Sequence, residues 1–292
     1  TNITTISLHT FFLSFLSQAQ CLAVDSQDVS RIVGGVPTTI ESHPYAVQVQ
    51  QSNYLICGGS LVSTRCVLSA AHCFVDSNNP VPNPRAYTVR VGSATVNSGT
   101  SHSVSTIVVH PAYSTATQDS DLAILVLTSR VTLSARVMVA QLLPPGFSVP
   151  DNATVTAIGW GRTRPADPWS GSPVLNEVDV RKVAFEECAA RYAALRLLLT
   201  RNMLCAGLLD AGGAGDSCFG DSGGPLLFSN AIAGVVSWGH ECALAQFPGV
   251  YVKATNYNSW INETLTRYNA APSLRTRALM LILSIIFSLI NK

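Results

Sequence analysis

The sequence predicts an all-β protein built from two antiparallel units. Short segments alternate apolar and polar residues with period two, and Gly, Pro, Asn and Ser cluster between them. Neither a long helical pattern nor a β-α-β alternation occurs, which favours an antiparallel barrel or sandwich for each unit. A connection at about residues 136–152 divides the two units. Strands are expected at 45–50, 87–91, 151–160, 225–228 and 232–238.

Two helices accompany these strands. Ala, Leu, Arg and Glu accumulate at 185–199, and a second helix is expected at about 256–268. The 292 residues are 47% hydrophobic and 12% charged, a composition typical of a globular chain with a sizeable core. The low charge content argues against a disordered or nucleic-acid-binding protein. The formal net charge of +1 indicates no general electrostatic partner.

The N-terminal region indicates the secretory route. Residues 11–16 are mostly apolar and are followed by small residues at Ser17 and Ala19, so we expect residues 1–21 to be a signal peptide with a truncated start. Cleavage after Ala19 and cleavage after Cys21 both fit, and the second would remove Cys21 from the mature protein. The chain has eight cysteines and N-x-T sequons at Asn152 and Asn262, which fit an oxidising compartment and glycosylation.

A polar segment at 22–31 ends in Arg31 and precedes Ile32-Val33-Gly34-Gly35. A cut after this basic residue would leave a new α-amino group on Ile32. Such a cation is buried at acceptable cost only against a carboxylate, and Asp221 is the expected partner. Without the other motifs, an ordinary flexible strand would explain this stretch equally well.

The glycine-rich stretch 215–225 places Ser222 in a turn. A serine hydroxyl is a weak nucleophile, so it needs an adjacent base and donors for the oxyanion that it creates. The backbone N–H groups of Gly220 and Ser222 are the candidate donors. Alone, the string also fits a glycine-rich β-turn.

The candidate base and its carboxylate partner lie earlier in the chain. His72 follows small residues in Leu68-Ser69-Ala70-Ala71, and Asp121 opens an otherwise apolar strand at 121–127. A lone histidine is usually structural, and a lone aspartate before a strand is usually a turn former. The order His, Asp, Ser, each in such a setting, instead indicates nucleophilic catalysis.

These motifs together resemble the trypsin/chymotrypsin-type serine proteases over about residues 31–268. The resemblance rests on Ala70-Ala71-His72-Cys73, Asp121-Leu122-Ala123, Gly220-Asp221-Ser222-Gly223-Gly224-Pro225 and Ile32-Val33-Gly34-Gly35. It implies a protease domain at 32–268, with two perpendicular six-stranded barrels at about 32–140 and 150–255, a cleft between them and a C-terminal helix. Residues 22–31 become an activation propeptide.

The resemblance also assigns roles. His72 would act as general base and acid, Asp121 would hold its tautomer, and Ser222 would form the acyl-enzyme, with Gly220 and Ser222 as the oxyanion hole. The stretch Ser237-Trp238-Gly239 would pair with the substrate backbone. Asp216, six residues before Ser222, would lie at the floor of a pocket whose walls are Gly239 and Gly249.

An anion at the end of an open pocket selects Arg or Lys. For Asp216 alone, a turn residue is the competing interpretation. We expect protein or peptide substrates with Arg or Lys before the scissile bond, protein inhibitors, a monomer and no cofactor. A catalytically silent homologue and a surface-anchored interaction protein are the alternative functions, and the complete triad favours an active enzyme.

The same resemblance predicts how the cysteines pair. It implies disulfides Cys57–Cys73, Cys188–Cys205 and Cys218–Cys242, whereas Val155 and Phe228 stand where many relatives have a further bridge. Cys66 has no evident partner and is expected to be a buried free thiol. The stretch 86–118 contains no carboxylate, so we expect no calcium and no other metal.

The C-terminal region 269–292 ends in an apolar run at 278–290. As a helix this run reaches about 20 Å, short of the roughly 30 Å hydrocarbon core. Small residues, a polar spacer and a terminal apolar run match a glycosylphosphatidylinositol signal, with Asn269 or a neighbour carrying the anchor. A short transmembrane anchor and an apolar tail packed on the barrel are the competing interpretations.

Overall fold

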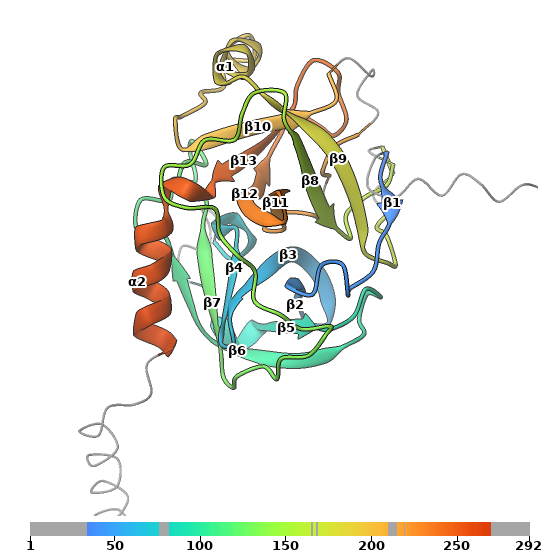
Figure 1. The fold of residues 1–292 in the computed structure, drawn as a ribbon, viewed down its shortest axis with the longest axis vertical. Coiled ribbons are helices and arrows are strands. Elements are labelled where there is room, and N and C mark those ends of the chain that lie inside the picture. Colours follow the sequence, from blue (N-terminus) through green and yellow to red (C-terminus); the bar gives the residue numbers. More distant parts are fainter. Residues whose placement is uncertain are drawn as a thin grey trace, which may run out of the picture.

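The first barrel closes through six antiparallel strands in the order β2-β3-β4-β7-β6-β5. The computed structural model describes residues 34–75, 82–164, 166–167, 169–209, 215–218 and 220–269. In Figure 1 this barrel occupies the lower half of the molecule, in blue and green. Its strands are β2 (Ala46–Gln51), β3 (Tyr54–Ser63), β4 (Cys66–Ser69), β5 (Tyr87–Val91), β6 (Thr100–Val109) and β7 (Ala123–Leu127).

The second barrel is also closed and antiparallel, in the order β9-β10-β13-β12-β11-β8, with β8 returning to pair with β9. The short strand β1 (Val36–Pro37) adds to β9 outside the ring. The barrel strands are β8 (Thr154–Gly159), β9 (Asn176–Val183), β10 (Met203–Gly207), β11 (Pro225–Phe228), β12 (Ala231–Trp238) and β13 (Gly249–Lys253). The prediction of two six-stranded barrels is confirmed.

Alternation of side chains explains which strands line a barrel. In β5, Tyr87, Val89 and Val91 are buried, and the residues between them are half-buried. In β7 all five residues are buried, because helix α2 (Asn258–Asn269) packs against β4 and β7 from outside the barrel. The apolar run after Asp121 therefore has protein on both faces.

The core of the first barrel extends into the second, which also has hydrophobic clusters of its own. The largest hydrophobic cluster contains the interior of the first barrel together with Ile158, Leu227, Val235 and Val252 of the second. This apolar interface fixes the barrels against each other, because burying such side chains contributes roughly 1.5–3 kcal/mol each.

The helix α1 (Phe185–Ala193) is shorter than the predicted 185–199. The N–H groups of Leu195 and Leu197 both donate to the Tyr192 carbonyl, at 3.0 and 3.1 Å, and Arg196 has a φ of +60°. A left-handed residue cannot continue a right-handed helix. Helix propensity over this leucine-rich stretch gave no sign of the turn.

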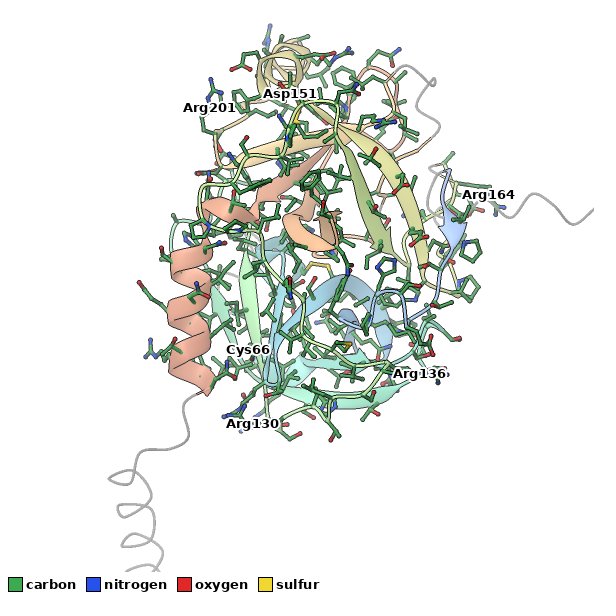
Figure 2. The ribbon with its side chains drawn as sticks, viewed as in Figure 1. Cys66, Arg130, Arg136, Asp151, Arg164 and Arg201 are labelled. Carbon is green, nitrogen blue, oxygen red and sulfur yellow. A yellow bond between two sulfur atoms is a disulfide. The ribbon has the colours of Figure 1, made fainter. Side chains whose placement is uncertain are left out.

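The three disulfides that the resemblance implies are present, with Cα–Cα distances of 6.3, 6.4 and 5.2 Å for Cys57–Cys73, Cys188–Cys205 and Cys218–Cys242. Cys66, labelled in Figure 2, is a buried free thiol, as predicted. Apolar contacts stand in place of the further bridge: Val155 is buried in the second core, and the Phe228 ring lies 5.9 Å from that of Phe147. Cys21 lies outside the described residues.

Candidate active site

Strand pairing in the first barrel brings His72 and Asp121 together. β4 and β7 are antiparallel neighbours with Ser69 opposite Ala123, so the 3-10 turn after β4 faces the residues that precede β7. His72 Nδ1 lies 2.7 Å from Asp121 Oδ2, and the His72 backbone N–H donates to Asp121 Oδ1 at 2.9 Å. Two contacts to one carboxylate fix both the position and the ring orientation of His72.

The second barrel adds a third donor to this carboxylate. The Ser237 hydroxyl donates to Asp121 Oδ2 at 2.5 Å, and Asp121 is fully buried. Burial by itself lowers the pKa of His72, but the hydrogen bond to Asp121 and its negative charge outweigh burial. The net pKa of His72 is therefore raised above its ordinary value.

The turn that carries Ser222 is packed tightly against the first barrel. The Gly58 N–H donates to the Ser222 carbonyl at 2.8 Å. Gly223 has a φ of +80°, and a side chain there would overlap the Ser69 hydroxyl. Only glycine satisfies both requirements, which explains why this part of the turn is glycine-rich.

Two N–H groups of the same turn are left for a ligand. The N–H groups of Asp221, Gly223 and Gly224 are all engaged in backbone hydrogen bonds. Those of Gly220 and Ser222 donate to no atom of the described residues. Gly220 has a φ of +102°, and a Cβ there would lie 3.0 Å from the Gly161 Cα. The two free donors belong to the residues that the sequence predicts for an oxyanion hole.

Asp221 is fully buried and both of its oxygens accept hydrogen bonds. Oδ1 accepts from the Gly161 N–H at 2.7 Å, and Oδ2 accepts from the Cys218 N–H at 2.9 Å. Burial raises the pKa of Asp221 to about 6, and the two N–H donors partly offset that effect. A side chain at Gly159 or Gly161 would overlap this carboxylate. These two glycines were missed by sequence reasoning, because they lie far from Asp221 in the chain.

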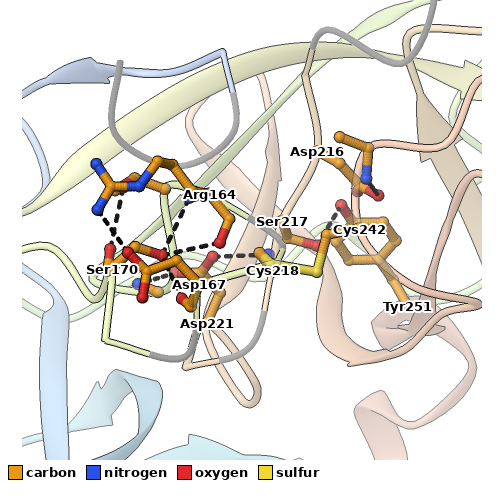
Figure 3. Close-up of a disulfide and its surroundings, with 12 residues drawn as sticks. Arg164, Asp167, Ser170, Asp216, Ser217, Cys218, Asp221, Cys242 and Tyr251 are labelled. Carbon is orange, nitrogen blue, oxygen red and sulfur yellow. Dashed lines mark hydrogen bonds and ion pairs between the residues drawn. A yellow bond between two sulfur atoms is a disulfide. The ribbon is translucent and has the colours of Figure 1, made fainter. Parts of the chain in front are cut away.

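One cavity of about 350 Å³ brings the predicted residues together. Figure 3 shows the surroundings of its floor, where Asp216, the Ser217–Tyr251 contact and the Cys218–Cys242 disulfide lie side by side. The predicted residues that line it are His72, Asp216, Cys218, Ser222, Ser237, Trp238, Gly239, Cys242 and Gly249. Four further residues line it, namely Gln118, Ser217, Val236 and Glu241. The family resemblance places Glu241 at the rim of the cleft, and the other three were not among the predicted site residues.

Gln118 and Glu241 share an unusual backbone. Their φ angles are +54° and +61°, values that non-glycine residues rarely adopt. Gln118 lies three residues before Asp121, and Glu241 directly precedes Cys242. Closeness in sequence to Asp121 was the signal available for finding Gln118.

Asp216 is an incompletely paired anion at the pocket floor. Its Oδ2 accepts from the Ala243 N–H at 3.1 Å, whereas its buried Oδ1 has no hydrogen-bond partner among the described residues. Gly249 leaves the space in front of this oxygen open, since a Cβ there would lie 2.7 Å from it. Burial raises the pKa of Asp216 to about 7. A buried acceptor of this kind is stabilised by a cationic donor.

Cys57, His72 and Cys73 form the one group of potential metal ligands found among the described residues. The two sulfur atoms are bonded to each other, so they are not available as thiolates. The chemistry of this donor set therefore fits a disulfide beside an imidazole and not a metal centre.

Comparison with known proteins agrees with this geometry. A family model described as Trypsin matches residues 32–261. Trypsin CFT-1 of Choristoneura fumiferana is 40% identical over 238 residues, which cover 79% of this chain and 90% of that protein. Kallikrein-7 of Homo sapiens is 36% identical over 256 residues, covering 87% and 94%. The chain therefore belongs to the trypsin family and is a trypsin-like serine endopeptidase.

Proposed function

We propose that this endopeptidase cleaves after Arg and Lys through an acyl-enzyme on Ser222. The single observation that carries the specificity is the buried Asp216 Oδ1, which has no partner among the described residues and lies beside Gly249 in the catalytic cavity. Arg or Lys in this pocket supplies the missing donor and the missing charge. A neutral side chain would leave the carboxylate unpaired, which costs several kcal/mol.

The proposed chemistry assigns one task to each group. His72, with Nδ1 directed at Asp121, presents Nε2 as the acceptor for the Ser222 proton. Ser222 Oγ attacks the scissile carbonyl, and the free N–H groups of Gly220 and Ser222 stabilise the oxyanion. His72 then gives its proton to the leaving amine, and a water molecule hydrolyses the ester. Ser237, Trp238 and Gly239 at the end of β12 hold the substrate backbone.

Activation by cleavage between Arg31 and Ile32 is the second part of the proposal. Both residues lie outside the described part of the chain, so the support comes from Asp221. Its raised pKa reflects a buried carboxylate that lacks a cation among the described residues, although two N–H groups bind it. The new ammonium of Ile32 would supply that cation and order the turn that contains Gly220 and Ser222.

We further propose a secreted, monomeric glycoprotein held at the cell surface by a glycosylphosphatidylinositol anchor. Both sequon asparagines, Asn152 before β8 and Asn262 on α2, are exposed. The region 270–292 lies outside the described residues. Within the residues that are described, no helix combines the length and the apolar character needed to cross a membrane. Protein substrates and protein protease inhibitors are the expected partners.

Specificity is tested by replacing Asp216. Wild-type protein cut at Arg31 should hydrolyse peptides after Arg and Lys in strong preference to Phe. Asp216→Ser should lower kcat/KM for the Arg peptide by about 10²- to 10³-fold, the scale of losing a buried ion pair. The variant should still be acylated by small neutral esters, because the triad is intact.

Two further variants control this experiment. Asp179→Ser removes an exposed carboxylate on β9 and should leave kcat/KM unchanged. Ser222→Ala should lose about 10⁶-fold in turnover, the scale of removing the nucleophile. Equal cleavage after Phe and after Arg by the wild type would contradict the role of Asp216 in binding Arg or Lys.

A further inference from the structure

The segment that joins α1 to β10 exposes an arginine on the protein surface. Arg196, Leu197 and Leu198 are consecutive exposed residues, and the two leucines are 42% and 69% exposed. Leu199, which follows the exposed residues, is buried and fixes the C-terminal end of the exposed stretch. The exposed stretch belongs to no helix or strand. Exposed segments of this kind are where proteases nick folded chains.

The backbone around Arg196 is held by few interactions. Its N–H donates to the Ala193 carbonyl at 2.9 Å, and the next N–H, from Leu197, donates to the Tyr192 carbonyl at 3.1 Å. The Arg196 side chain forms no ion pair or hydrogen bond with the described residues. Its φ of +60° is strained for a residue with a side chain, so opening the turn to an extended conformation relieves strain.

The other exposed arginines within the described part of the chain are less accessible as cleavage sites. Arg164 precedes Pro165, which lacks an N–H and restricts the preceding backbone. Arg136 and Arg201 form ion pairs with Glu41 and Glu186. Arg130 donates to Thr64 Oγ1 and to the Asn269 carbonyl, and Arg181 and Arg267 lie within β9 and α2. Figure 2 labels Arg130, Arg136, Arg164 and Arg201.

Arg85 is the nearest comparison to Arg196. It is exposed and forms no ion pair among the described residues. It lies, however, in the 3-10 turn Pro84–Ala86, where Asn83 Oδ1 accepts its N–H, and β5 begins two residues later at Tyr87. Cleavage there would require the barrel strand to open.

We infer that the Arg196–Leu197 bond is a self-processing site, cut by a second active copy of this chain. The inference rests on the proposed Arg/Lys specificity. Ser222 Oγ of the cutting copy attacks the Arg196 carbonyl carbon, the C–N bond breaks, and His72 gives the proton to the Leu197 nitrogen. Water then hydrolyses the ester, which leaves a carboxylate on Arg196 and an ammonium on Leu197.

The Cys188–Cys205 disulfide determines what this cut produces. One cysteine lies before the cut and the other after it, so the disulfide joins the two pieces across the break. The nicked enzyme therefore remains one covalent molecule of two chains.

The cut segment also lies close to residues of the catalytic cavity. The Thr200 hydroxyl donates to Asp119 Oδ1 at 2.5 Å, and Asp119 directly follows Gln118, which lines the cavity. In the last turn of α1, just before the segment, the Tyr192 ring lies 5.0 Å from that of Trp238, which also lines the cavity. Nicking should therefore change KM for peptides that extend along this wall more than the rate with small esters.

The test follows the activated wild-type chain over time on gels run with and without reductant. We expect a fragment that appears only after reduction and begins at Leu197 by N-terminal sequencing. Because one copy cuts another, the fraction cut per unit time should rise with protein concentration. Arg196→Gln should slow cleavage here by about 10²-fold or more, since the pocket then receives no cation. Arg196→Lys should still be cut, and Arg85→Gln should behave as wild type.

Two results would overturn the inference. One is a wild-type enzyme that cleaves arginine peptides but gives no Leu197 terminus; the other is unchanged nicking between Cys188 and Cys205 in Arg196→Gln. Adding trypsin to the Ser222→Ala chain separates this failure from failure of the proposed specificity. Suppose that trypsin cleaves the Arg196–Leu197 bond but the wild-type protein cleaves no arginine peptide. The bond is then accessible, the proposed specificity is wrong, and the self-processing inference is wrong for that reason.

Discussion

At the scale of single residues, the two buried carboxylates of the serine turn differ in how completely they are hydrogen-bonded. Both oxygens of Asp221 accept backbone N–H groups, whereas only one oxygen of Asp216 has a partner among the described residues. Burial raises the pKa of both, to about 6 for Asp221 and about 7 for Asp216. The carboxylate with the free oxygen is the one that lines the cavity, which fits a role in binding a cation.

The pH dependence of the reaction should report His72. Its imidazole must be neutral to accept the Ser222 proton, so kcat/KM should fall as the pH falls through its raised pKa. Ser237→Ala removes one donor from Asp121 Oδ2 and leaves more negative charge facing His72. The pKa of His72 should rise further, and the acid limb of kcat/KM should move to higher pH.

A small neutral ester is the appropriate substrate for this measurement. Asp216, whose pKa is raised to about 7, also changes its charge near neutral pH, and this would affect the binding of cationic substrates. Ser105→Ala removes a serine hydroxyl that donates to the Val126 carbonyl in the first barrel, and should leave the acid limb in place. An acid limb in Ser237→Ala that stays at the wild-type pH would contradict the coupling through Asp121.

Sequence motifs predicted the residues that line the cavity and left their surroundings undetermined. His72, Asp216 and Ser222 each stand in a short local pattern that alone also fits a structural residue, and it is the combination of these patterns that identified them. The contact between Gly161 and Asp221 depends on folding, because β8 and the serine turn are distant in the chain. Gln118 belongs to no motif, and only the folded chain brings it to the cavity.

At the scale of elements, strands with a clear alternation were predicted well. The strand at 87–91 has the predicted bounds, because its odd-numbered residues face the barrel interior and the others face outward. The predicted 151–160 begins three residues early, since Asn152 forms a turn with a φ of +60° before β8. The helix at 185–199 was predicted too long, because the left-handed residue that ends it is an arginine and not a glycine.

The segment before β1 should control activity through a single bond. Arg31→Gln keeps the Ile32 nitrogen in a peptide bond, so no ammonium can pair with Asp221. We expect activity lower by about 10²-fold or more than in the processed protein, the scale of losing a buried ion pair. The measurement is kcat/KM with an arginine peptide, together with N-terminal mass analysis.

Arg164→Gln is the matched control for this variant. It removes another exposed arginine, whose one ion pair among the described residues is with Asp167, three residues away. This variant should be processed and active like the wild type. Full activity of Arg31→Gln with an unprocessed N-terminus would rule the activation mechanism out.

At the scale of the whole molecule, periodicity alone predicted two antiparallel β units, and the family resemblance specified closed barrels. The reason is physical: alternation shows that one face of each strand is buried, but it does not show which strand closes the sheet. The first barrel is closed by the pairing of β2 with β5, which are not consecutive strands. The second is closed by the pairing of β8 with β9, which are consecutive strands joined by a long loop. These strand pairings cannot be predicted from the amino-acid composition.

The proposed attachment to the cell surface also concerns the whole molecule. Treating expressing cells with a phosphatidylinositol-specific phospholipase should release the protease into the medium, since the anchor lipid is the bond to the membrane. A variant that ends at Tyr268 should reach the medium without treatment. The lipid anchor would be contradicted if the wild type stayed on the treated cells and the mature protein still contained a C-terminal peptide with Leu279 to Leu289.

The hydroxyl of Ser237 and the carboxylate of Asp121 come from different barrels, as do the Gly58 N–H and the Ser222 carbonyl. In the proposed mechanism the base belongs to the first barrel and the nucleophile to the second, so each half of the fold completes the chemistry of the other. Separated halves should therefore have no proteolytic activity. For a protease, this division means that its own degradation should leave no active fragments.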